Sequence, residues 1–206
     1  ENVRIFDNTM TGAEKGVYGD DVVNIQVFDN TLSGTTVAGI HIVNSDGIGY
    51  DGSGNDVDIW GNTVTSASGT GILVENSAYA TIGADALNPF ASGYAGGNNV
   101  SGGDAGIVVE YSDHAQILFS TVDSVNGHGI TVEGGEDVLV DTNRVGTSGG
   151  AGNIKGDGIR IVGSNDAKVR GNQVQNTVRV AQPGDASTDL GAGIRVLNSE
   201  GVQVGG

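Results

Sequence analysis

Hydrophobic and polar residues alternate along the chain in short runs that return at a fixed distance. In the segment 106–143, the run GIVV returns 23 positions later as GITV, and the run STV returns after the same distance as NRV. Within these runs every second position is apolar, which indicates strands with one buried face, and the Gly, Asn, Asp and Ser residues between them indicate turns. A fixed period with short strands predicts an all-β solenoid.

Two recurring residues set the phase of the predicted coils. A glycine followed by Ile or Val opens one strand, and an asparagine closes the next strand, which gives a basic coil of 22 or 23 residues and about eight coils in all. Amide side chains tolerate left-handed corners, and they can bond to their copies in coils stacked ~4.8 Å apart. We therefore expect a structural ladder at one corner. Its expected members are Asn8, Asn30, Asn62, Asn99, Asn143 and Asn172.

The apolar residues that follow the recurring glycines are the expected core. If the alternation is right, they stack inward in two adjacent rows. These rows contain Ile72, Val74, Ile107, Val109, Ile130, Val132, Ile159 and Ile161. We expect the residues 1–206 to form one continuous solenoid segment. Because its first and last residues have the phase of a strand, we further expect a piece of a longer chain, or copies that stack end to end.

The 206-residue chain is strongly acidic, with 25 Asp and Glu against nine Lys and Arg and a formal net charge of −16. No Lys or Arg occurs from 16 to 143, and seven of the nine bases lie between 144 and 195. So negative a surface repels a phosphate backbone, which argues against nucleic-acid binding. No apolar run approaches the ~18 residues of a membrane span. The absence of cysteine excludes disulfides and zinc–thiolate sites.

Insertions into the basic coil mark where a ligand could bind. The insertions at 46–54 and 84–97 leave the same corner of consecutive coils, so we expect them to touch. Aromatic rings beside a carboxylate suit a sugar, and the candidate carbohydrate-binding residues are Tyr50, Asp51, Phe90 and Tyr94.

The first of these insertions also spaces oxygen-bearing side chains as a calcium loop does. The candidate metal ligands are Asp51, Ser53, Asn55 and Asp56. The glycine and the distal glutamate of an EF-hand loop are missing, so ordinary turn residues remain the alternative. No cofactor is certain, and Ca²⁺ is possible.

The coil pattern resembles the right-handed parallel β-helix repeat of pectate lyases, polygalacturonases, alginate epimerases and many bacterial surface proteins. The segment from TIG at 81–83 to GNNVSG at 97–102 is also similar to a stretch that recurs in large secreted bacterial β-helix proteins. The resemblance implies a right-handed parallel β-helix and an extracellular or cell-surface location in a bacterium. The fold alone does not imply one function, because it carries both enzymes and inert stalks.

Catalytic motifs of these relatives are incomplete in this chain. The elements around His128 and Arg160 resemble the G-H-G and R-I-K elements of polygalacturonases, but of the three carboxylates that hydrolysis needs at most Asp104 is present. The cluster from Tyr111 to His114 is the nearest approach to an epimerase or lyase motif. We assign no catalytic residues and leave enzymatic activity open.

Three functions therefore stay open. The first is a non-catalytic segment of a secreted bacterial surface protein, such as a stalk, adhesin or filament subunit, with a possible carbohydrate-binding loop face. The second is a polysaccharide lyase or C5-epimerase. The third is a passive carbohydrate-binding module. The expected partners are a polysaccharide or neighbouring copies of the chain.

Overall fold

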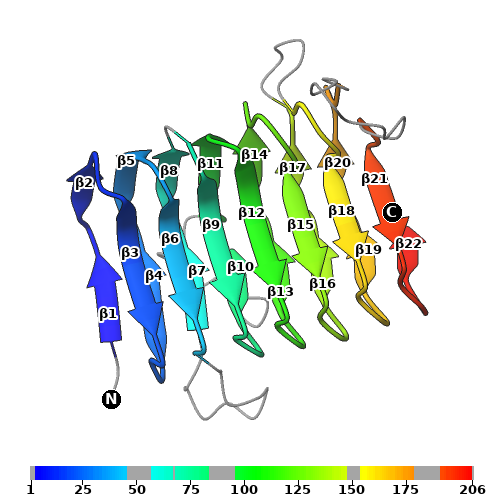
Figure 1. Cartoon of the computed structure of the whole chain (residues 1–206), viewed down its shortest axis with the longest axis horizontal. Helices are drawn as coiled ribbons and strands as arrows, with labels where there is room; N and C mark the ends of the chain where they lie inside the picture. The colour runs from blue at the N-terminus through cyan, green and yellow to red at the C-terminus, as the bar shows by residue number, and fades with distance from the viewer. Residues whose placement is uncertain are drawn as a thin grey trace.

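The protein is a solenoid in which the chain passes in turn through three parallel sheets (Figure 1). The computed structural model describes residues 3–45, 57–66, 68–83, 96–147, 154–178 and 191–205. Consecutive strands belong to different sheets, and each strand pairs with its counterparts in the neighbouring coils. The sequence prediction of an all-β solenoid of about eight coils is confirmed.

Sheet A contains the strand that precedes the asparagine corner in each coil. All of its strand pairs are parallel and in register. Among the described residues it has eight strands: β1 (Val3–Phe6), β4 (Ile25–Phe28), β7 (Val57–Trp60), β10 (Thr81–Gly83), β13 (Gln116–Leu118), β16 (Leu139–Asp141), β19 (Lys168–Arg170) and β22 (Gln203–Gly205).

Sheets B and C complete each coil. The described strands of sheet B are β2 (Thr9–Thr11), β5 (Thr31–Thr35), β8 (Thr63–Ser66), β11 (Asn99–Gly102), β14 (Thr121–Asp123), β17 (Arg144–Val145) and β20 (Gln173–Val174). Those of sheet C are β3 (Lys15–Asp20), β6 (Ala38–Val43), β9 (Thr70–Glu75), β12 (Ala105–Glu110), β15 (Ile130–Glu133), β18 (Ile159–Val162) and β21 (Ile194–Leu197).

The interior is a stack of Ile, Val and Leu side chains contributed by every coil. The eight residues expected in two inward rows of sheet C are all buried, which confirms the assigned alternation. Their register follows the expected rows, as where Ile130 pairs with Ile107 on one side and Ile159 on the other. The recurring glycines from Gly16 to Gly158 lie where an added Cβ would collide with neighbouring atoms. A Cβ on Gly106 would stand 2.3 Å from a Val122 methyl group.

Asparagine side chains form a hydrogen-bonded ladder at the corner between sheets A and B. The Nδ2 of Asn30 donates to the Oδ1 of Asn62 at 3.0 Å, and the Nδ2 of Asn62 donates to Asn98 at 3.0 Å. The next member is Ser120, whose hydroxyl accepts from the backbone N–H of Asn98. Each such side chain satisfies corner backbone groups that the interior would otherwise leave unpaired.

One expected member of this ladder was wrong. Asn99 is exposed and begins β11, and Asn98 takes the ladder position instead. Both asparagines follow the insertion at 84–97, where counting residues from the previous coil no longer determines the phase. The backbone N–H of Asn99 bonds to the carbonyl oxygen of Asn62, which fixes its register as that of a strand residue.

Serine hydroxyls form a second ladder, at the corner between sheets C and A. The backbone N–H of Ser45 donates to the Oγ of Ser77 at 3.0 Å, and that of Ser77 donates to Ser112 at 2.9 Å. Each Oγ in turn donates to the carbonyl oxygen two residues earlier in the chain. The two ladders hold the corners on either side of sheet A, so the outward side chains of that sheet have fixed positions.

Candidate functional site

The outer face of sheet A carries rows of polar and aromatic side chains that run along the solenoid. Because the strands are in register, equivalent positions repeat in each coil about 4.8 Å apart. One row contains Gln116, Leu139, Lys168 and Gln203 at paired positions. A second row, two residues further along each strand, contains Leu118, Asp141, Arg170 and Gly205.

A stacked pair of rings lies at the corner that leads into sheet A. Tyr79 and His114 have their ring centroids 4.6 Å apart with an interplanar angle of 22°. Both residues have left-handed backbone conformations, with φ of 60° and 57°, and the N–H of each donates to a carbonyl oxygen of the following coil. Equivalent corner geometry in consecutive coils therefore explains why the rings stack.

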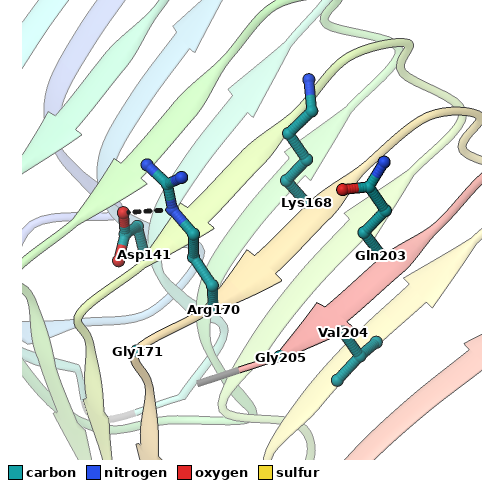
Figure 2. A pocket seen from close by; sticks show the side chains of 7 residues that line it. All are labelled: Asp141, Lys168, Arg170, Gly171, Gln203, Val204 and Gly205. Carbon is teal, nitrogen blue, oxygen red and sulfur yellow. Dashed lines mark hydrogen bonds and ion pairs between the residues drawn. The ribbon is translucent and has the colours of Figure 1, made fainter.

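Two ion pairs continue the site toward the C-terminal coils. The Nζ of Lys168 lies 3.4 Å from Asp137, and the Nε of Arg170 lies 2.8 Å from Asp141. Arg170 bonds through Nε, so its two terminal nitrogens remain directed outward (Figure 2). Its side chain is 62% exposed, which leaves these donors accessible to a ligand.

Two adjoining hollows join these groups into one groove along sheet A. The first, of about 480 Å³, is lined by Asp141, Lys168, Arg170, Gly171, Gln203, Val204 and Gly205, and Figure 2 shows Lys168 and Gln203 side by side above Arg170. The second, of about 280 Å³, is lined by Tyr79, His114, Gln116, Asp137, Leu139, Lys168 and Arg170. Since both hollows share Lys168 and Arg170, we treat them as one site, the sheet A groove.

Aromatic residues continue the outer face of sheet A into the N-terminal coils. Phe6 stacks on Phe28 with centroids 4.9 Å apart, and Phe28 stacks on Trp60 with centroids 4.6 Å apart. The guanidinium of Arg4 lies over Phe28 at 5.0 Å. These three aromatic residues occupy paired positions on β1, β4 and β7. Phe6 is 44% exposed, whereas Trp60 is almost buried.

A second polar cluster lies on sheet C around a fully buried carboxylate. Asp157 accepts hydrogen bonds from the Nε of Arg195 at 2.7 Å and from the backbone N–H of Ala192 at 2.9 Å. Its own N–H donates to the Nδ1 of His128 at 2.9 Å. Loss of hydration on burial, together with the nearby Arg160 and Arg195, lowers the pKa of His128, although Asp157 acts in the opposite direction. The imidazole is therefore held neutral with its proton on Nε2.

A row of stacked carboxylates lies on the same face of sheet C. Glu75, Glu110 and Glu133 occupy paired positions in three consecutive coils. Partial burial and the two neighbouring carboxylates raise the pKa of Glu110. Glu75 also bonds to the Nε2 of His41, a nearly buried residue. Among the described residues, no group of three or more His, Asp or Glu side chains is placed to hold a metal ion.

A comparison with protein families identifies the fold that these sheets form. A model described as "Right handed beta helix region" matches residues 46–206. The chain belongs to this right-handed β-helix family.

The β-helix is also similar to the solved structure of an enzyme. The crystal structure of a mutant of the periplasmic alginate epimerase AlgG superposes with a TM-score of 0.62 at 18% sequence identity. The match covers 98% of this chain but only 47% of the epimerase chain. No curated protein matches the sequence. At this identity the likeness shows the fold alone.

The carbohydrate and calcium sites that the sequence suggested fall in parts of the chain that the structure does not describe. Tyr50, Asp51, Ser53, Asn55, Asp56, Phe90 and Tyr94 all lie outside the described residues, as does nearly all of both insertions that were expected to touch. The candidate carbohydrate and calcium sites therefore stay predictions. In the described part of the chain, no helix is long and apolar enough to cross a membrane.

The residues compared with catalytic motifs have separate structural roles. Ser112 belongs to the serine ladder, the ring of Tyr111 packs where a Cβ on Gly134 would stand, and His114 stacks on Tyr79.

The sheet A groove was not predicted from the sequence. The signal that could have found it is the spacing of Tyr79, His114 and Asp137 at equivalent positions before successive sheet A strands.

Proposed function

We propose that this β-helix is a non-catalytic scaffold that binds a polysaccharide along the outer face of sheet A. The observation that carries the proposal is the groove in which the stacked rings of Tyr79 and His114 are followed, toward the C-terminal coils, by Lys168 and Arg170 on β19 and by Gln203 on β22. Rings offer an apolar face to the C–H groups of a sugar, while guanidinium, ammonium and amide groups bond to its hydroxyls. The groove has the size of a site for a small part of a glycan chain.

The architecture supports a scaffold role. A continuous aliphatic core, an asparagine ladder and a serine ladder fix each coil on its neighbours, so side chains on the surface keep regular positions along the axis. Such a surface suits a secreted or cell-surface protein of the stalk or adhesin kind. We propose this location together with the binding function.

A panel of soluble polysaccharides tests the proposal by affinity gel electrophoresis. We expect at least one neutral or acidic glycan to retard the protein, and we expect the variants Tyr79→Asn and Arg170→Gln to migrate faster in the same gel. Asn is chosen at position 79 because it tolerates the positive φ found there. The matched control is Arg144→Gln, an exposed residue of sheet B, which should bind as the unaltered protein does. If no glycan retards the protein, or if all three variants behave alike, the proposal is wrong.

A lyase or C5-epimerase is the second candidate function, and the observation that favours it is the fold that this chain shares with an alginate epimerase. Both reactions require a group that takes the proton from C5 of a uronate. His128 uses Nδ1 to accept the N–H of Asp157, so its outward nitrogen is a donor and cannot take that proton. Incubation with alginate and pectin, followed by the absorbance of unsaturated products, tests the lyase directly. We expect no increase; an increase that His128→Gln abolishes would establish the enzyme.

A further inference from the structure

We propose that the sheet A groove selects an uncharged, extended glycan and binds it with about one sugar unit per coil. This inference rests on the proposed polysaccharide-binding function and adds the class of ligand. It follows from the spacing of the site, from its charge balance and from the chemistry of its side chains.

The spacing of sheet A favours an extended chain parallel to the solenoid axis. Paired residues such as Gln116, Leu139, Lys168 and Gln203 recur once per coil in exact β-register. Neighbouring strands lie about 4.8 Å apart, which is close to the length of one ring unit in a fully extended glycan. A coiled glycan would leave this row after one or two units, whereas an extended chain meets an equivalent position at each step.

The charges of the groove do not favour an acidic glycan. Lys168 already has Asp137 as its partner and Arg170 already has Asp141, so the two cations are balanced by two carboxylates. The nitrogen of His114 also lies 3.9 Å from Asp137. The protein as a whole carries a formal charge of −16, which repels a polyanion at a distance. A uronate that pairs with either cation would therefore lie beside an existing carboxylate, which repels it.

Sheet C provides the contrast within the same molecule. Arg160 and Arg195 occupy paired positions on neighbouring strands, and the single carboxylate of Asp157 pairs with Arg195. Among the described carboxylates, none forms an ion pair with Arg160. Arg160 is thus a cation without such an ion pair that lies on sheet C, outside the groove. An acidic glycan that binds on sheet C should depend on Arg160, and a neutral glycan bound in the groove should not.

The side chains of the groove match sugar hydroxyls. Gln116 and Gln203 each offer a donor and an acceptor, which a hydroxyl group can use at the same time. The paired Asp141 accepts, and the outward nitrogens of Arg170 donate. At one end, the rings of Tyr79 and His114 give the apolar surface on which a pyranose ring packs. None of these contacts requires a charged ligand.

Competition between neutral and acidic glycans tests the inference on the intact chain. The probes are hydroxyethyl cellulose and glucomannan as neutral extended glycans, and alginate and polygalacturonate as polyuronates, each in affinity gels at low and at high salt. We expect the neutral glycans to bind with little dependence on salt and the polyuronates to bind less tightly. Tyr79→Asn should weaken neutral binding by about two- to tenfold, and Arg160→Gln should leave it unchanged.

A charge variant should shift the predicted preference toward polyuronates. Asp141→Asn keeps the size of the side chain but removes the charge that balances Arg170. We expect it to increase polyuronate binding by about two- to fivefold, the range of one exposed ion pair. Tighter polyuronate binding by the unaltered protein that Tyr79→Asn weakens would overturn the inference and leave polysaccharide binding by the groove intact. Retardation by none of the four glycans would overturn the inference and the proposed function together.

Discussion

Replacing one asparagine of the ladder tests how the corners are held. Asn62 is almost fully buried, and its Oδ1 accepts the backbone N–H of Asn30 at 3.1 Å. Its Nδ2 donates to the carbonyl oxygens of Val27 and Trp60, each at 2.9 Å, and to the Oδ1 of Asn98. In Asn62→Ala these hydrogen bonds are lost and the N–H of Asn30 has no acceptor inside the protein.

The size of the effect follows from these contacts. An unsatisfied buried donor costs about 1–3 kcal/mol, and each lost hydrogen bond contributes about 0.5–1.5 kcal/mol. We expect Asn62→Ala to reduce the free energy of unfolding by about 3–5 kcal/mol. Asn62→Ser should cost about half as much, because Ser120 already occupies an equivalent ladder position and its hydroxyl accepts the N–H of Asn98.

Urea unfolding monitored by the fluorescence of Trp60 measures both variants, since this is the single tryptophan of the chain and lies two residues before the substitution. Circular dichroism in parallel shows whether the whole solenoid unfolds in the same transition. A stability of Asn62→Ala within 0.5 kcal/mol of the unaltered protein, or equal stabilities of the two variants, would refute the reasoning from the ladder.

Three further substitutions probe the core, the row of carboxylates on sheet C and one of the recurring glycines. Ile130→Ala should lower the free energy of unfolding by about 2–5 kcal/mol in urea, because it empties a fully buried site. Glu110→Gln should raise that free energy at neutral pH by up to about 1 kcal/mol, since it removes repulsion from Glu75 and Glu133. A raised folded-state pKa means that ionisation destabilises the fold, so this gain should disappear when the pH falls below the unfolded pKa of about 4.3; a gain that persists in acid would contradict the assignment. Gly106→Ala should lower the melting temperature, because its Cβ would stand 2.3 Å from a backbone carbonyl oxygen of the next coil.

The period of the sequence was sufficient to predict the solenoid, because each coil must bury the same alternating positions. The inward rows of sheet C follow from that constraint and are confirmed. The error at Asn99 arose after a long insertion, where two adjacent asparagines satisfied the pattern equally well and only the strand register distinguishes them. The sequence pattern predicts which position of the coil a residue occupies only while the coil length stays constant.

The groove was harder to predict than the fold. Tyr79 and His114 meet because both adopt positive φ at the same corner, and a tyrosine does not ordinarily signal that conformation. The serine ladder was missed for a related reason, since serine occurs throughout the loops and only its position relative to a strand end selects the members. Sequence spacing does not specify the direction of such side chains.

Mapping the bound glycan on the protein by nuclear magnetic resonance tests the account most directly. Backbone and side-chain signals of the labelled protein would be followed as a neutral extended hexasaccharide is added to saturation. We predict that the shifted signals cluster at Tyr79, His114, Lys168, Arg170 and Gln203 along sheet A. Shifts confined to the Arg160 region of sheet C, or no shifts at saturating hexasaccharide, would contradict the claim that sheet A binds a polysaccharide.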